Sequence, residues 1–228
     1  MSAPLQHFPP EGAASDRALV IFPGGGYSIL APHEGEGYAK RFARAGVDCY
    51  VAAYPLASDG FRHPAMIQAA QAAIAEVRAR LDPPVRLGVM GSSAGGHLAA
   101  HALVEWERTE KQHRPDFGVL CYPVVTMMPQ HRHTGSRDNL LGPAPAETLL
   151  AEVSIEQRVT PRTPPCFIWH TVEDATVPVE HSFLLASALR QAGVPFELHA
   201  YARGRHGLGL ETPYDWSGDC LRWMRELA

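Results

Sequence analysis

The chain has 228 residues, of which 46% are apolar and 19% are charged, and its formal net charge is -4 at pH 7. This length and apolar content suit one domain with a full core. The small negative charge and scattered basic residues argue against a nucleic-acid partner or an anionic membrane surface. No apolar stretch reaches the length of a membrane span, and residues 1–10 lack the charged-then-apolar layout of a signal peptide.

The spacing of the cysteines and histidines shows no pattern typical of disulfides or metal sites. The chain has four widely spaced cysteines without a C-x-x-C pair: Cys49, Cys121, Cys166 and Cys220. Three of them fall in apolar runs, so we predict buried, reduced thiols in a cytoplasmic protein. His131 and His133 lie in a polar loop without nearby cysteines or an H-x-x-x-H spacing, so we expect no metal there. The composition leaves the oligomeric state open, a homo-oligomer included.

Apolar runs typical of parallel strands alternate with amphipathic segments typical of helices along the chain. Residues 1–17 are rich in proline and polar side chains, which predicts an irregular lead-in or a short edge strand. Strands are predicted at 18–22, 48–54, 85–90, 117–122, 166–170 and 196–202. Helices are predicted at 36–45, 66–81, 94–108, 179–192 and 216–227. This alternation indicates a single α/β domain over 1–228, with a mostly parallel central sheet covered by helices on both faces.

The alternation breaks between residues 126 and 165, where proline, histidine and glycine are frequent. One short helical piece, 146–150, is predicted in this loop-rich insertion. The insertion is too short for a domain, but it is long enough to rim an active site. Ligands of open parallel sheets bind at the carboxyl ends of the strands, and the polar motifs of this chain follow such ends.

Residues 91–95 read Gly-Ser-Ser-Ala-Gly and lie between an apolar strand and a helical pattern. In that context a G-x-S-x-G run forms a sharp elbow that exposes a nucleophilic serine above the sheet. We expect a Cβ at position 91 or 95 to collide with the neighbouring strand and helix, and a strained backbone at Ser93. The helix that starts behind Ser93 favours a developing oxyanion. Ser93 is therefore the candidate nucleophile.

A serine nucleophile needs a base to take its proton and an acid to orient that base. The chain order expected for this architecture is serine, acid, histidine, and Asp174 and His206 follow successive predicted strands in that order. The structural alternatives are a helix cap or turn for Asp174 and a surface-loop histidine for His206. Glu173 is the competing acid, but Asp174 lies nearer the turn into the next helix.

Three other histidines lie near these motifs in the sequence. His170 precedes the acid at a strand end, so we predict that it packs in the interior rather than acting as the base. His97 and His101 fall on the helix behind Ser93, and we interpret both as structural residues.

A glycine run at 24–26 follows the first strong strand and predicts an oxyanion hole, because only glycine lets main chain approach a substrate oxygen so closely. We assign the N–H groups of Gly25 and Gly26 to it, together with that of Ala94. The alternative is a phosphate-binding loop, but neither G-x-G-x-x-G nor G-x-x-x-x-G-K-[ST] is present. Tyr27 either lines the acyl or leaving-group side of the site or packs in the core.

With these motifs the chain resembles the α/β-hydrolase group of small carbohydrate esterases, which is similar to acetyl xylan esterases. The resemblance runs from about residue 18 to the C-terminus and rests on PGGGY at 23–27, HEGE at 33–36, GSSAGGHL at 91–98, RPDF at 114–117 and residues 170–178. It implies an α/β-hydrolase fold without a large cap domain, and a triad of Ser93, Asp174 and His206. Pro23 stands where the lipase glycine motif begins with histidine, so any role of that histidine is lost.

The resemblance implies a serine esterase that removes acetyl groups from sugars or short xylan fragments, without metal or organic cofactor. The segment after Tyr54 is too short for a bulky lid, which favours acetyl over fatty esters. A general short-chain carboxylesterase or a kynurenine-formamidase-like amidase would use the same triad. A non-catalytic α/β-hydrolase scaffold that binds a ligand is the alternative from another class, although the intact serine, aspartate and histidine argue against it.

Overall fold

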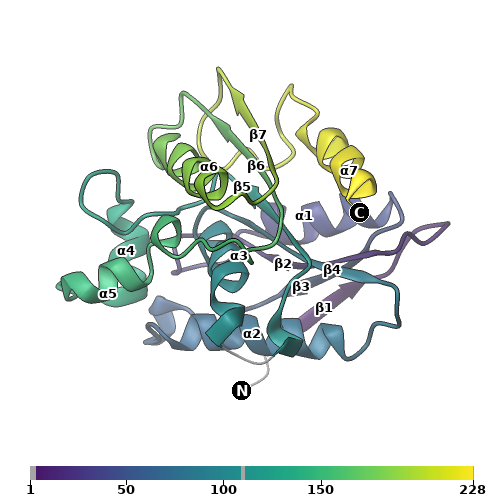
Figure 1. Ribbon diagram of the computed structural model, residues 1–228, viewed down its shortest axis with the longest axis horizontal. Coiled ribbons are helices and arrows are strands. Elements are labelled where there is room, and N and C mark those ends of the chain that lie inside the picture. Colours follow the sequence, from purple (N-terminus) through teal and green to yellow (C-terminus); the bar gives the residue numbers. More distant parts are fainter. Residues whose placement is uncertain (1–3, 109–110, 228) are drawn as a thin grey trace.

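The computed structural model describes residues 4–108 and 111–227, and their strands form one central seven-stranded sheet (Figure 1). The strands are β1 (Leu5–Phe8), β2 (Arg17–Phe22), β3 (Asp48–Ala52), β4 (Arg86–Ser92), β5 (Phe117–Cys121), β6 (Cys166–Thr171) and β7 (Phe196–Tyr201). Their spatial order is β1-β3-β2-β4-β5-β6-β7, and only β1 runs antiparallel to its neighbour. The predicted mostly parallel sheet is confirmed, and the lead-in contains an edge strand.

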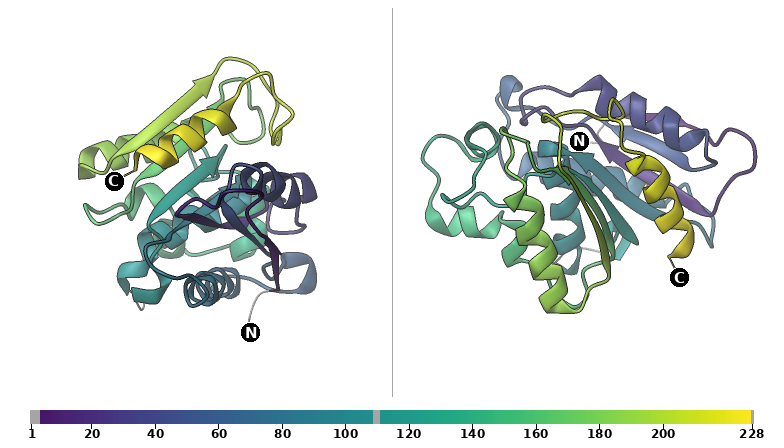
Figure 2. Two further views of the ribbon diagram at one scale, coloured as in Figure 1. Left: turned by 90° about the vertical axis from the view of Figure 1, so that its right-hand side faces the viewer. Right: turned by 90° about the horizontal axis from the view of Figure 1, so that it is seen from above.

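Helices cover both faces of this sheet, as predicted (Figure 2). They are α1 (Pro32–Ala43), α2 (Ala65–Arg78), α3 (Ser93–Glu105), α4 (Thr134–Leu141), α5 (Glu147–Glu152), α6 (Glu180–Ala192) and α7 (Trp216–Glu226). Helices α1 and α7 share one apolar cluster with Leu19 and Ile21 of β2, whereas α2, α3 and α6 share the other with Val20 and Phe22. Successive side chains of β2 therefore enter opposite layers, which is why the strand is continuously apolar.

Helix α1 begins at Pro32, four residues before the predicted start at 36. Proline at the first helical position and an acidic residue in the first turn are helix-start signals. The prediction used only the apolar spacing and missed them. The earlier start places Glu34 in the first turn of α1, beside the glycine run at 24–26.

The insertion at 126–165 holds more helix than predicted. Helix α5 corresponds to the predicted piece at 146–150, but α4 was not predicted. Its eight residues include a glycine and show no clear apolar face. The His133 side chain accepts a hydrogen bond from Ser136 N at its start, and Leu140 is fully buried. A cap and one anchoring contact stabilise this helix, and such tertiary support leaves little signal in the sequence.

All four cysteines are buried and free, as predicted, whereas the cytoplasmic location stays a prediction. Over the described part of the chain, no helix is long and apolar enough to cross a membrane. The same residues contain no group of three or more histidine, cysteine, aspartate or glutamate side chains placed to hold a metal ion.

Two buried histidines give the fold a predictable response to acid. Burial lowers the pKa of His97 and of His181 to about 4 from an ordinary value of 6.5, although each ring also donates to a backbone carbonyl. Between these pH values the unfolded chain binds more protons than the folded protein, so stability falls as the pH falls. We expect each histidine to remove about 1.4 kcal/mol of the free energy of unfolding per pH unit across this window. Urea denaturation at pH 7, 6, 5 and 4 measures this, and a flat profile would contradict it.

Candidate active site

Ser93 lies in the elbow between β4 and α3 with φ +53°, the left-handed backbone expected for a strained nucleophile turn. A Cβ on Gly91 would lie 2.1 Å from the carbonyl oxygen of Gly95. A Cβ on Gly95 would lie 2.1 Å from the carbonyl oxygen of Phe22 at the end of β2. The predicted collisions are therefore confirmed: Gly95 lets the elbow pack against the end of β2, and Gly91 lets β4 pack against the first turn of α3.

The elbow yields a prediction with a control on the same chain. Gly95→Ala is expected to destabilise the fold by more than the range of about 1–3 kcal/mol found for overpacked cores, because the atoms it meets are rigid backbone. Gly37→Ala in α1 meets nothing within 4 Å and should stabilise the protein by about 0.5–1 kcal/mol. Urea denaturation of both variants measures the difference. Equal free energies of unfolding for Gly95→Ala and Gly37→Ala would contradict the tight packing of the elbow.

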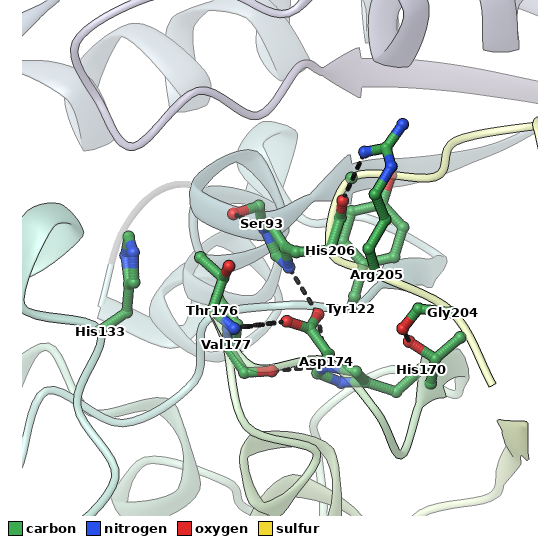
Figure 3. Close-up of polar contacts among 12 residues, drawn as sticks. Ser93, Tyr122, His133, His170, Asp174, Thr176, Val177, Gly204, Arg205 and His206 are labelled. Carbon is green, nitrogen blue, oxygen red and sulfur yellow. Dashed lines mark hydrogen bonds and ion pairs between the residues drawn. The ribbon is translucent and has the colours of Figure 1, made fainter. Parts of the chain in front are cut away.

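Ser93, His206 and Asp174 meet at the carboxyl ends of β4, β7 and β6 (Figure 3). His206 Nε2 lies 2.8 Å from Ser93 Oγ, and His206 Nδ1 lies 2.6 Å from Asp174 Oδ2. A carboxylate only accepts hydrogen bonds, so His206 carries its proton on Nδ1 and presents Nε2 as an acceptor for the Ser93 hydroxyl. The three predicted residues therefore form one hydrogen-bonded line from acid to base to hydroxyl.

The Asp174 carboxylate is held on both oxygens. Oδ1 accepts from the backbone N–H groups of Thr176 and Val177, each at 2.9 Å, and Oδ2 accepts from His206. Burial alone would raise the pKa of Asp174, but hydrogen bonds from His170 and His206 and the charge of His206 outweigh it and hold this pKa well below its ordinary value. Asp174 is thus both the turn residue and the partner of His206, which were separate alternatives in the sequence.

The competing residues have other contacts. His170 is fully buried, with Nδ1 2.8 Å from Ser182 Oγ and Nε2 2.9 Å from the Val177 carbonyl oxygen and 3.3 Å from Asp174 Oδ2. It therefore supports the loop of Asp174 and does not contact Ser93. Glu173 accepts from Gly204 N at 3.2 Å, outside the line of the triad residues. His97 and His101, at 0% and 2% exposure, are interior residues of α3, as predicted.

The glycine run at 24–26 lies directly beside the elbow. A Cβ on Gly24 would stand 2.9 Å from the carbonyl oxygen of Ser92 and 3.2 Å from Ser93 Cβ. Gly24 N donates to Glu34 Oε2 at 2.9 Å, whereas Gly25 and Gly26 have φ values of +126° and +63°. Asn139 of α4 donates to the Gly26 carbonyl oxygen at 2.7 Å, so the insertion helps fix this loop.

The Tyr27 side chain does not line the site, and the core alternative is the one observed. Tyr27 is fully buried, and its hydroxyl lies 2.7 Å from His97 Nδ1. His97 Nε2 donates to the Val153 carbonyl oxygen at 2.7 Å, so Nδ1 accepts from the Tyr27 hydroxyl. With φ +63°, Tyr27 directs its ring inward to α3 and joins the glycine loop to the insertion.

His133, from the insertion, lies near the triad residues and was not predicted to (Figure 3). Burial and then the charge of His206 lower its pKa, and Asp174 opposes this effect. Its Nδ1 accepts from Ser136 N, so the neutral ring carries its proton on Nε2. The sequence located the insertion at the rim of the site but carried no signal that distinguished this histidine from its neighbour His131.

Comparisons with known proteins establish the family of this chain. The family profile described as the alpha/beta hydrolase fold matches residues 19–210. The chain belongs to the α/β-hydrolase family. The family inferred from the sequence motifs is thereby confirmed.

Two relatives and one solved structure extend this result. This α/β-hydrolase is 34% identical over 214 residues to endo-1,4-beta-xylanase B of Butyrivibrio fibrisolvens and 32% identical over 233 residues to acetylxylan esterase of Xylanibacter ruminicola. The matches cover 88% and 93% of the chain but 34% and 46% of those proteins, so it spans less than half the length of either. The crystal structure of acetyl ester-xyloside bifunctional hydrolase from Caldicellulosiruptor lactoaceticus matches with a TM-score of 0.88 and 37% identity, covering 97% of this chain and 86% of that one.

Proposed function

We propose that this α/β-hydrolase is a serine esterase that removes acetyl groups from carbohydrate esters such as acetylated xylan or xylo-oligosaccharides. The observation that carries the proposal is the hydrogen-bonded line from Asp174 through His206 to Ser93, with contacts of 2.6 and 2.8 Å. The substrate class is supported by the names of its relatives, an acetylxylan esterase and an acetyl ester-xyloside hydrolase.

Acylation follows from the hydrogen-bond directions. Ser93 Oγ attacks the ester carbonyl carbon while His206 Nε2 takes the hydroxyl proton, and Asp174 stabilises the imidazolium that forms. The N–H groups of Gly25, Gly26 and Ala94 are the proposed donors to the carbonyl oxygen as it becomes negative. The bond to the sugar oxygen then breaks, and the leaving sugar takes the proton from His206 Nε2.

Deacylation repeats these proton transfers with water. His206 Nε2 removes a proton from a water molecule, whose oxygen attacks the acetyl carbon on Ser93 Oγ. The bond to Oγ breaks, Ser93 recovers its proton from His206, and acetate leaves. The chain's own side chains and backbone supply every proton transfer and every oxyanion contact in this cycle.

His133 gives the carbohydrate side of the proposal a candidate contact. Its Nε2–H is a hydrogen-bond donor, since Nδ1 is occupied by Ser136 N at 3.2 Å. A neutral donor at the rim of the site suits a sugar hydroxyl, because it forms the hydrogen bond without a charge that would have to be desolvated.

The proposal is tested by acetate release from acetylated xylo-oligosaccharides, together with a series of p-nitrophenyl esters from acetyl to octanoyl. We expect acetate release from the oligosaccharides and a kcat/KM for the acetyl ester at least about tenfold above that for the octanoyl ester. Hydrolysis of p-nitrophenyl esters without acetate release from the sugars would favour a general short-chain carboxylesterase. Cleavage of an N-formyl amide at a higher rate than acetate release from the oligosaccharides would favour the formamidase-like alternative. Either outcome would overturn the carbohydrate assignment.

A further inference from the structure

A buried carboxylate lies between the glycine loop and the loop that carries His206. Glu34, in the first turn of α1, is 3% exposed. Its Oε2 accepts from Gly24 N at 2.9 Å, and its Oε1 accepts from the Tyr122 hydroxyl at 2.6 Å. Ser93, His206 and Asp174 do not contact this carboxylate, so the hydrogen bonds among these three residues do not explain why it is buried.

Tyr122 contacts both Glu34 and the loop of His206. Its hydroxyl oxygen accepts from Gly209 N at 3.0 Å, three residues beyond His206. Its ring lies edge-on to the His206 ring, with centroids 5.1 Å apart and an interplanar angle of 71°. Tyr122 itself has φ +36°, a strained backbone for a residue other than glycine. The loop that carries His206 therefore rests on Tyr122 through both a ring contact and a hydrogen bond.

A series of hydrogen bonds connects the elbow to Glu34, and Glu34 is its final acceptor. Ser92 Oγ donates to the Tyr38 hydroxyl at 3.0 Å, and the Tyr38 and Tyr122 hydroxyls are 3.0 Å apart. Because Tyr122 must donate to the carboxylate, Tyr38 donates to Tyr122. Burial and then the charge of Glu34 hold the pKa of Tyr122 well above its ordinary value, so the hydroxyl keeps the proton that it donates.

We propose that Glu34 is a positioning residue for acyl transfer: one buried carboxylate sets the spacing between the glycine loop and the loop of His206, through Gly24 N and the Tyr122 hydroxyl. The inference rests on the proposed serine-esterase function of the site. Both contacts need an acceptor, and a carboxylate offers two where an amide offers one. A second contact from the same turn of α1, between His33 Nε2 and the Gly207 carbonyl oxygen at 3.1 Å, reaches the same loop.

The test is Glu34→Gln, assayed as kcat per active site titrated with a p-nitrophenyl phosphonate. The amide can accept from Gly24 N or from Tyr122 but not from both, so one loop shifts relative to Ser93. We expect kcat per titrated site to fall about 100-fold, as for a misplacement of about 1 Å, while KM for p-nitrophenyl acetate changes little. A merely structural role would lower the melting temperature or the number of titrated sites and leave kcat per site unchanged.

Glu36→Gln is the matched control. Glu36 lies on the same helix but is exposed and pairs with Lys40, so its replacement should leave kcat per site unchanged. Tyr122→Phe completes the design, since it keeps the ring beside His206 and removes only the hydroxyl. If Glu34 acts on His206 through Tyr122, the double variant should lose less than the product of the two single losses.

The outcomes separate this inference from the proposed function. No phosphonate labelling of the wild-type protein would overturn the proposed function itself. Normal labelling of the wild type, with Glu34→Gln at wild-type kcat per site, would overturn the inference and leave the proposed function standing. Fully multiplicative losses in the double variant would overturn the link through Tyr122.

Discussion

Replacing Ser93 by alanine is expected to lower kcat for p-nitrophenyl acetate about a millionfold, the scale of loss when a serine nucleophile of this kind is removed. The change deletes one oxygen whose hydrogen-bond partner in the structure is His206 Nε2, at 2.8 Å. The alanine Cβ occupies the place of the serine Cβ in the same left-handed backbone, so the fold should be retained. Steady-state rates with and without the substitution measure the effect, and circular dichroism checks the fold.

Ser217→Ala is the control for this experiment. Ser217 is also largely buried, but it lies on α7 and its hydroxyl contacts Arg41 and Asp215 rather than the triad residues. Its replacement should leave the rate unchanged. A p-nitrophenyl phosphonate should label the wild type and Ser217→Ala at one site and fail to label Ser93→Ala. Labelled Ser93→Ala, or an unchanged rate in that variant, would rule out Ser93 as the nucleophile.

Asp174→Asn is expected to lower kcat about 10⁴-fold, as when an asparagine fixes the wrong tautomer of a catalytic histidine. The structure shows why the tautomer should change. Oδ1 of Asp174 accepts from Thr176 N and Val177 N, so the asparagine must keep its carbonyl oxygen there and turn its NH₂ group to His206. His206 Nδ1 then accepts, Nε2 carries the proton, and the ring cannot take the proton of Ser93. Rates over a pH series, at matched fold by circular dichroism, measure the loss.

The neighbouring acid provides the comparison. Glu173→Gln removes a carboxylate that accepts from Gly204 N and lies outside the contacts of His206, so it should change kcat little. The pair of variants decides between the two acids that the sequence left in competition. A large loss in Glu173→Gln with normal activity in Asp174→Asn would reverse the assignment.

The parts of the site that could be predicted from sequence are those with a local signature. The elbow at 91–95 needs glycine because a Cβ would meet backbone, and that need is visible in five residues. Asp174 and His206 follow strands in the expected order, and the two strands are neighbours in the parallel sheet. Strand ends that adjoin in one parallel sheet lie at the same edge, so chain order was enough to bring these residues together.

The supporting residues could not be predicted in the same way. Glu34, Tyr122 and His133 each belong to a different segment, and each role depends on contacts with segments far away in the sequence, such as the 88-residue separation between Glu34 and Tyr122. Tyr27 was left open between the substrate side and the core because its ring direction depends on a positive φ at a residue other than glycine. Helix α4 was missed because its stability comes from a cap and a buried leucine rather than from an apolar face.

By itself, the sequence determined the α/β alternation, the positions of six strands along the chain, the elbow and the two residues that join Ser93. These follow from periodicity, steric demands and chain order. The tertiary structure decided which acid contacts His206, which way Tyr27 faces, and how a buried carboxylate joins two loops of the site. The features that only the tertiary structure decided depend on contacts between segments far apart in the sequence. A hydrogen bond needs a donor and an acceptor that folding brings to about 3 Å from each other, and no local pattern of residues encodes that distance.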